Sequence, residues 1–172
     1  GRSWGFRFLL KGGLSDPLLV YERSFADLED EPATCHRAAG KVALCFPDTY
    51  ELSDKPTAKS VLKSITTQFN AVTSDLGFAD GADALGYSPY EVLVMASIIE
   101  KEAGPREEDR AKIARVFYNR LEQGMQLQSD ATVAYANNVT GRVSTTAAER
   151  KLKSPYNTYY VKGLPIGPIA SP

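Results

Sequence analysis

The chain has 172 residues, of which 43% are hydrophobic and 24% are charged, values that are ordinary for a globular protein. A formal net charge of −1 argues against a broad nucleic-acid-binding surface. No run of about 18 or more apolar residues occurs, so no segment of this sequence is expected to span a membrane. The sequence Trp4 to Leu10 is too short for a signal peptide. Because the chain begins with Gly-Arg-Ser, we expect a fragment whose targeting segment lies upstream.

Neither a metal site nor a cofactor is predicted. The only histidine, His36, lies in a polar stretch that is typical of a surface. Cys35 and Cys45 are compatible with a disulfide in an oxidising compartment and equally with two free thiols, so both alternatives stay open.

The first part of the chain is expected to contain short strands. Residues 1–40 are interpreted as a poorly defined N-terminal segment, with strands within Trp4–Leu10 and Leu18–Tyr21. The stretch Val42 to Tyr50 is apolar and β-prone until Pro47-Asp48, which predicts a strand that enters a turn.

Two helices have clear boundary signals. Pro56 and Thr57 open a helix that ends near Gly77. In the next helix Ser88 is the expected N-cap, and Pro89 follows at the first helical position. This helix is predicted to run to Ala103, with Gly104 in the left-handed conformation.

The second half of the chain predicts shorter elements. A helix is expected to begin at Pro105, with a buried stripe of Ile113, Val116, Phe117 and Leu121. Ser129 or Asp130 is expected to cap a helix through Tyr135, a small helix is possible over Thr146–Leu152, and residues 154–172 are expected to form an ordered loop. The predicted fold class is α+β: a mainly helical catalytic core with short strands and a small N-terminal appendage.

The helix that ends at Ala103 carries two carboxylates in its last turn. Counting back from Glu102 in steps of three and four gives Ile99, Ile98 and Met95, so Glu102 lies on the apolar stripe, whereas Glu100 lies on a more polar row. A carboxyl among apolar neighbours tends to stay protonated and can serve as a general acid. Glu102 is therefore the predicted acid, with Glu100 as the alternative.

Polar and aromatic residues recur in the second half of the chain where a purely structural role would not need them. Aromatic faces beside amides and hydroxyls suit a sugar ring, whose CH surface stacks and whose hydroxyls form hydrogen bonds. Each also has a structural interpretation as a cap or as packing. The candidate substrate-binding residues are Asn119, Gln128, Asp130, Tyr156, Asn157 and Tyr159.

Six segments together resemble the YceG-like (MltG) family of endolytic murein transglycosylases. They cover residues 43–172 in the family's order and are Phe46-Pro-Asp-Thr-Tyr-Glu51, Met95-Ala-Ser-Ile-Ile-Glu-Lys-Glu102, Val116-Phe-Tyr-Asn-Arg-Leu121, Gly124-Met-Gln-Leu-Gln-Ser-Asp130, Ser154-Pro-Tyr-Asn-Thr-Tyr159 and Gly163-Leu-Pro-Ile-Gly-Pro-Ile169. The chain departs from the family at Ala131 and Ile166, where proline is common. The family continues beyond residue 172, so residues 41–172 are interpreted as a catalytic region that is incomplete at its C-terminus.

The resemblance implies a membrane-anchored bacterial enzyme at the extracytoplasmic face of the cell membrane. Such enzymes cut the MurNAc–GlcNAc β-1,4 bonds of nascent peptidoglycan strands and form 1,6-anhydroMurNAc. The family's catalytic Glu aligns best with Glu102, and no cofactor is implied. Implied partners are peptidoglycan glycan strands and proteins of cell-wall synthesis and division, with no nucleic acid.

Two other interpretations remain open from the sequence. One is a non-catalytic peptidoglycan-binding or divisome-scaffold segment. The other is an unrelated helical protein, which predicts that Glu102 forms a surface salt bridge and that no cleft lies beside it. Glu102 in a cleft flanked by Asn119, Gln128 and Tyr156 would exclude the last interpretation.

Overall fold

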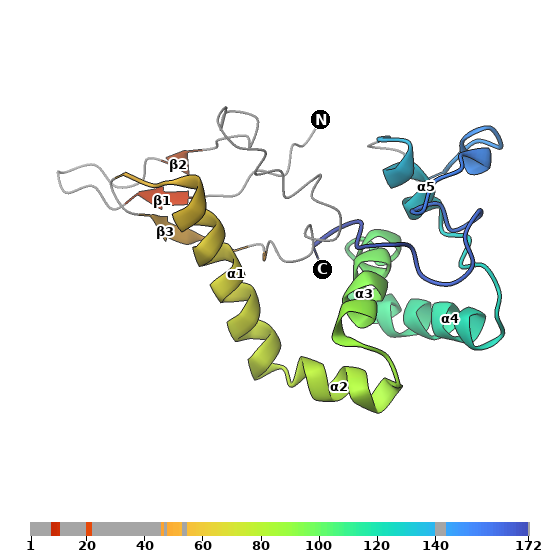
Figure 1. Cartoon of the computed structure of the whole chain (residues 1–172), viewed down its shortest axis with the longest axis horizontal. Coiled ribbons are helices and arrows are strands. Elements are labelled where there is room, and N and C mark those ends of the chain that lie inside the picture. Colours follow the sequence, from red (N-terminus) through yellow and green to blue (C-terminus); the bar gives the residue numbers. More distant parts are fainter. Residues whose placement is uncertain are drawn as a thin grey trace.

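The computed structural model of the chain describes residues 8–10, 20–21, 46, 48–52, 55–139 and 144–171. The described part is mainly helical, with a small sheet at one end, and it belongs to the α+β class (Figure 1). The described residues do not include Cys35, His36 or Cys45. The two alternatives for the cysteines, a disulfide or two free thiols, are therefore both still open.

Three short strands form the sheet. β1 (Phe8–Leu10) pairs antiparallel with β2 (Val20–Tyr21) and parallel with β3 (Tyr50–Leu52). The first two strands confirm the predictions for Trp4–Leu10 and Leu18–Tyr21 over the described residues. β3 begins at Tyr50, after the turn at which the predicted strand was expected to end, and residues 42–45 lie outside the described ranges.

Helix α1 (Ala58–Asp75) follows the predicted boundaries because its N-terminus is capped locally. The hydroxyl of Thr57 accepts from the amide of Ser60 at 3.1 Å, and the Ser60 hydroxyl accepts from the Thr57 amide at 3.0 Å. Gly77, with φ of 60°, then allows the chain to turn into α2 (Phe78–Leu85). Helix α2 was not predicted from the sequence, because its eight residues include Gly81 and form too few turns to show an apolar periodicity.

Helix α3 (Pro89–Ala103) confirms the prediction at both ends. Ser88 and Glu91 form the expected capping box, and α3 ends at Ala103. Gly104 has the expected positive φ of 57°, but its ψ of −131° lies outside the left-handed helical region. The positive φ of Gly104 favours glycine at this position. Because its ψ differs from that of a left-handed helical cap, the chain leaves the helix in a different direction from the one predicted.

The next helix starts later than predicted. A 3₁₀ turn, η3 (Glu107–Asp109), precedes α4 (Arg110–Glu122), so Pro105 does not open an α-helix. Phe117 is buried as expected, but Val116 is 51% exposed, and its place in the buried stripe was wrong. Adjacent residues of a helix point about 100° apart, so only one of these two can centre on the face that packs against α3.

The core joins helices α3 and α4 to the loops that follow them. Its buried residues are Met95, Ile98, Phe117, Leu127 and Ile169. The Ser97 hydroxyl accepts from the Ile169 amide at 3.0 Å and so fixes the C-terminal stretch against α3, beside which Figure 1 shows it passing. The short helices α5 (Asp130–Ala136) and η4 (Glu149–Lys151) complete this half. The described helices include none with the length and apolar character that a bilayer crossing requires.

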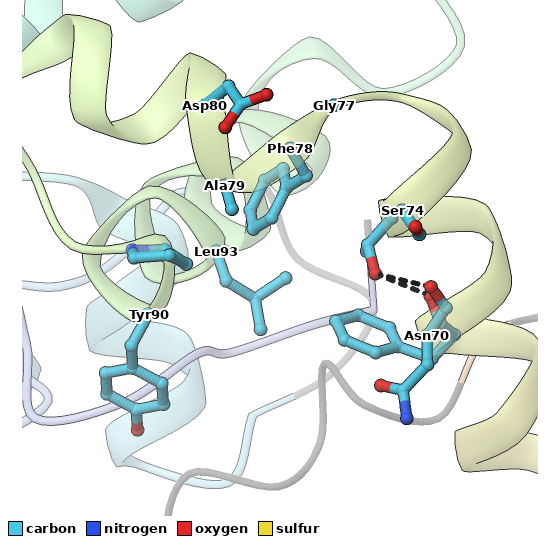
Figure 2. Close-up of a pocket in the computed structure, with 11 residues that line it drawn as sticks. Asn70, Ser74, Gly77, Phe78, Ala79, Asp80, Tyr90 and Leu93 are labelled. Atoms are coloured by element: carbon cyan, nitrogen blue, oxygen red, sulfur yellow. Dashed lines mark hydrogen bonds between the residues drawn. The ribbon is translucent and has the colours of Figure 1, made fainter.

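An open hollow of about 560 Å³ lies between α1, α2 and α3. Figure 2 shows Asn70 of α1 across the hollow from Tyr90 and Leu93 of α3, with Phe78 of α2 above them. Neither this hollow nor the smaller one between β3 and α1 includes Glu102.

Candidate active site

Glu102 lies in the last turn of α3, at the edge of the core. Met95 and Ile98 on the same helix face are buried, but the side chain of Glu102 is exposed. The expected apolar surroundings of Glu102 were therefore wrong, because the stripe ends before the helix does. A carboxyl in this position is open to a ligand from solvent.

One oxygen of Glu102 is held from the opposite side by Ser129. The Ser129 hydroxyl donates to Oε1 of Glu102 at 2.5 Å, although the two residues are 27 positions apart. Ser129 is the N-cap residue of α5 as predicted, yet its side chain makes no capping hydrogen bond. Oε2 of Glu102 has no hydrogen-bond partner among the described residues, so this oxygen is available to a ligand.

The other carboxylate of the pair, Glu100, faces the start of α4. Its Oε2 lies 2.9 Å from Nη2 of Arg110 in an ion pair, and the Glu100 side chain is 33% exposed. In the described part of the chain no lysine or arginine pairs with Glu102 in this way. Glu100 is therefore neutralised by a partner, whereas Glu102 is not, and this contrast favours Glu102 as the reacting group.

Two buried threonines fix the backbone of Ser129. The Ser129 amide donates to Oγ1 of Thr158 at 2.9 Å, and the hydroxyl of Thr132 donates to the Ser129 carbonyl at 2.7 Å. Because the single hydroxyl hydrogen of Thr132 is used on that carbonyl, the 2.7 Å contact between the two threonine hydroxyls has Thr158 as its donor. Thr132 and Thr158 are both 0% exposed, so water does not compete for these bonds.

Asp130, the next residue, is surrounded by donors. Oδ1 accepts from the Thr145 hydroxyl at 2.7 Å and from the Tyr159 hydroxyl at 2.9 Å, and Oδ2 accepts from the Thr145 amide at 3.2 Å. Nε of Arg150 lies 3.5 Å from Oδ1. Burial alone would raise the pKa of Asp130, but the hydrogen bonds from Thr145 and Tyr159 and the charge of Arg150 together hold that pKa below its usual value.

Tyr159 donates its hydroxyl to Asp130 and lies within the electrostatic influence of Glu102. Burial, the hydrogen bond to Asp130 and the negative charges of Asp130 and Glu102 raise the pKa of Tyr159, while Arg150 opposes the increase. The guanidinium of Arg150 lies 5.2 Å from the centroid of the Tyr159 ring, within range of a cation–π contact. The predicted residues Glu102, Asp130 and Tyr159 therefore lie close together.

Asn157 does not have the exposed position that a substrate-binding residue requires. It is 0% exposed, its amide nitrogen donates to the carbonyls of Arg150 and Leu152 at 2.9 and 2.7 Å, and its Oδ1 accepts from the Tyr159 amide at 2.9 Å. The expected direct contact of Asn157 with substrate is incompatible with this burial. Its amide instead orders the loop that carries Tyr159.

The remaining candidates differ in exposure. Tyr156 packs against Tyr135, with ring centroids 4.9 Å apart. This agrees with the structural interpretation of Tyr156 as a packing residue. Asn119 is half-buried on α4, and its side chain has no hydrogen bond to the described residues. Gln128 is exposed and has a φ of 51°, a conformation that non-glycine residues adopt rarely and that costs about 1–3 kcal/mol. Gln128 is the residue directly before Ser129, so its unusual backbone conformation determines how the chain enters Ser129.

Several residues of the hydrogen-bond network beside Glu102 were not predicted. Thr132, Thr145 and Arg150 were not candidates. Ser129 was expected as a possible cap and was among the recurring polar residues, but it was not assigned to the site. Ser129 and Thr158 fall inside the motif segments that end at Asp130 and Tyr159, and both belong to the recurring polar residues of this part of the sequence. Within the described ranges, no group of three or more His, Cys, Asp or Glu side chains is arranged to hold a metal ion.

The YceG-like family matches residues 19–172. An endolytic murein transglycosylase of Bacillus subtilis is 40% identical over 129 residues, which are 73% of this chain and 34% of that protein. One from Streptococcus pneumoniae serotype 2 is 34% identical over 131 residues, 74% of this chain and 23% of that protein. This chain thus spans about a third and about a quarter of these two relatives.

A solved structure agrees with the sequence relatives. The crystal structure of a YceG-like protein from Listeria monocytogenes superposes with a TM-score of 0.68 at 36% sequence identity, over 75% of this chain and 41% of that one. The family match extends over most of the sequence, and the same fold recurs in a member whose structure is solved. The chain belongs to the YceG-like family.

Proposed function

We propose that the full-length protein is an endolytic lytic transglycosylase of peptidoglycan. It cleaves MurNAc–GlcNAc β-1,4 bonds within nascent glycan strands and leaves 1,6-anhydroMurNAc ends. The observation that carries this proposal is the Glu102 carboxylate, which is exposed, bound by Ser129 at Oε1 and without an ion-pair partner in the described structure. Relatives that are 34–40% identical are named endolytic murein transglycosylases, which supports the same reaction class.

Glu102 serves in turn as acid and as base. Its protonated carboxyl gives a proton to the glycosidic oxygen as the bond to MurNAc C1 breaks. The resulting carboxylate then takes the proton from the C6 hydroxyl of the same MurNAc, whose oxygen bonds to C1 and closes the anhydro ring. The proton count balances, and the nucleophile comes from the substrate, so one enzyme carboxyl is sufficient.

The state of Asp130 supports a non-hydrolytic reaction. A glycoside hydrolase needs a second carboxyl group that serves as a nucleophile or activates water. Asp130 follows Ser129 directly, but both of its oxygens accept hydrogen bonds and Arg150 pairs with it. Its lowered pKa keeps it ionised and its donors keep it in place. We therefore give Asp130 and Tyr159 the role of ordering the loops beside Glu102.

Glycan contacts are assigned to exposed or half-buried residues near these loops. Gln128 is exposed directly before Ser129, and Tyr156 and Asn119 are half-buried in the same half of the molecule. We propose that these three orient the sugar and that the protein acts at the extracytoplasmic face of the bacterial membrane, anchored there by a part outside this sequence. Its further partners in this proposal are proteins of cell-wall synthesis and division.

The proposal is tested with purified sacculi. Full-length protein is incubated with them, and the products are examined by mass spectrometry for 1,6-anhydro ends within the glycan strands. We expect such ends to accumulate with time. A protein that sediments with sacculi but produces no anhydro ends would instead be the non-catalytic peptidoglycan-binding scaffold.

A further inference from the structure

Ser129 uses its hydroxyl in a way that its position in α5 does not explain. At an N-cap, a serine hydroxyl ordinarily accepts from an amide of the first helical turn. The hydroxyl of Ser129 makes no such bond and donates across the loop to Glu102 instead. In the described structure Glu102 is the one acceptor within hydrogen-bond distance of that hydroxyl.

The residue has little freedom to adopt another arrangement. Ser129 is 2% exposed, its amide is bonded to Thr158, and its carbonyl is bonded to Thr132. The preceding residue, Gln128, is in a left-handed conformation that orients the peptide entering Ser129. Backbone bonds on both sides and burial around the side chain thus leave the hydroxyl aimed at one atom, Oε1 of Glu102.

The consequence concerns where the proton of Glu102 resides. A donor on Oε1 is compatible with the ionised carboxylate. In the protonated acid it leaves Oε2 to carry the proton, because a proton on Oε1 would require the Ser129 hydroxyl to turn and accept. Oε2 is also the oxygen that has no partner in the described structure. A single oxygen is therefore available both to give and to receive the proton.

We propose that Ser129 is a positioning residue of the reaction, whose hydroxyl fixes Oε1 of Glu102 and reserves Oε2 for proton exchange with the glycan. This inference rests on the function proposed above. Ser129 itself contacts no reacting atom, and it acts through the orientation of Glu102. Thr132 and Thr158 in turn maintain the orientation of Ser129.

The test compares Ser129→Ala with Ser97→Ala in the full-length protein. Ser97 is a matched control because its hydroxyl is also buried and hydrogen-bonded, between the Val94 carbonyl and the Ile169 amide, but it does not contact Glu102. For each variant, the rate of anhydro-end release is measured at a temperature at which the variant is folded, together with the melting temperature and co-sedimentation with sacculi.

We expect Ser129→Ala to lower the turnover rate about 10- to 100-fold, a part of what general acid–base catalysis contributes. Co-sedimentation should be unchanged. The loss should therefore lie in the turnover rate and not in the affinity for the glycan. Ser129→Thr, which keeps the hydroxyl, should restore most of the turnover rate. Ser97→Ala should lose stability while its turnover rate, measured where the variant is folded, stays close to that of wild type.

The positioning role is wrong if Ser129→Ala turns over within about twofold of wild type. It is equally wrong if Ser129→Thr does not restore the turnover rate, or if Ser97→Ala loses as much turnover as Ser129→Ala at a temperature at which both variants are folded. Wild-type protein that releases no anhydro ends would overturn the proposed function instead. An active wild type with an inactive Glu102→Gln and a fully active Ser129→Ala would overturn only the role of Ser129.

Discussion

Asp130→Asn is a nearly isosteric change at the residue with the most donors around it. In the structure, Oδ1 receives the hydroxyls of Thr145 and Tyr159, and Oδ2 receives the amide of Thr145. An asparagine can keep its oxygen toward the Thr145 amide, but its NH₂ group then faces the hydroxyls of Thr145 and Tyr159, which must turn and become acceptors. The substitution therefore removes the charge and replaces three hydrogen bonds to a carboxylate with neutral ones.

The size of the effect follows from these contacts. Hydrogen bonds to a charged group are worth about 1.5–3 kcal/mol each, against about 0.5–1.5 kcal/mol for neutral ones. Three such bonds are affected, and the Asp130 side chain is only 24% exposed, so solvent replaces little of the loss. We expect Asp130→Asn to lower the free energy of unfolding by about 2–3 kcal/mol at pH 7.

The pH dependence has a definite sign. The folded-state pKa of Asp130 lies below its ordinary value of 3.8, so the folded state binds this proton less readily than the unfolded state. The stabilisation is then complete above about pH 4 to 5 and is lost as the pH falls through the folded-state pKa. The free-energy difference between wild type and Asp130→Asn should therefore be constant from pH 7 to 5 and shrink below pH 4.

Urea unfolding followed by circular dichroism at pH 7, 5, 4 and 3 measures this difference. Asp83→Asn is the control, because Asp83 is exposed on α2 and its substitution should change stability by less than about 0.5 kcal/mol. A difference between wild type and Asp130→Asn that stays the same at pH 3 and pH 7 would refute the reasoning.

Two further predictions concern the core and the sheet. Leu127→Ala should destabilise the protein by about 2–5 kcal/mol, because Leu127 is 0% exposed and packs with Met95 and Ile98; a loss below about 1 kcal/mol in urea unfolding would contradict this. Burial and the charge of Asp48 raise the pKa of Tyr50 to about 12, so the ultraviolet absorbance difference between wild type and Tyr50→Phe should titrate near pH 12, and a midpoint near pH 10 would show that Tyr50 is not buried as described.

The sequence predicted those elements whose ends are determined locally. The capping boxes at Thr57 and Ser88 are each formed within four residues, so α1 and α3 were placed correctly. The 3₁₀ turn before α4 and the orientation of Val116 depend on how α4 meets α3, and periodicity alone does not contain that information.

The choice between the two carboxylates shows the same limit. Helical periodicity favoured Glu102 because of its apolar neighbours, but the structure distinguishes Glu102 by its hydrogen-bond and ion-pair partners. Glu100 is paired with Arg110, which is ten residues away, and Glu102 is bound by Ser129, which is 27 residues away. Asn157, a candidate for substrate binding, is buried for a related reason: its amide donates to two carbonyls that only the folded loop brings close to it.

The most direct test of the central claim is the release of anhydro-muropeptides by paired variants of the full-length protein. Glu102→Gln and Glu100→Gln are incubated with sacculi under identical conditions, and the products are quantified by mass spectrometry. We predict that Glu102→Gln loses at least about 100-fold of the wild-type rate, as expected for removal of the general acid and base. Glu100→Gln should retain activity and lose only the ion pair with Arg110. Full activity in Glu102→Gln, with the loss in Glu100→Gln instead, would contradict the account.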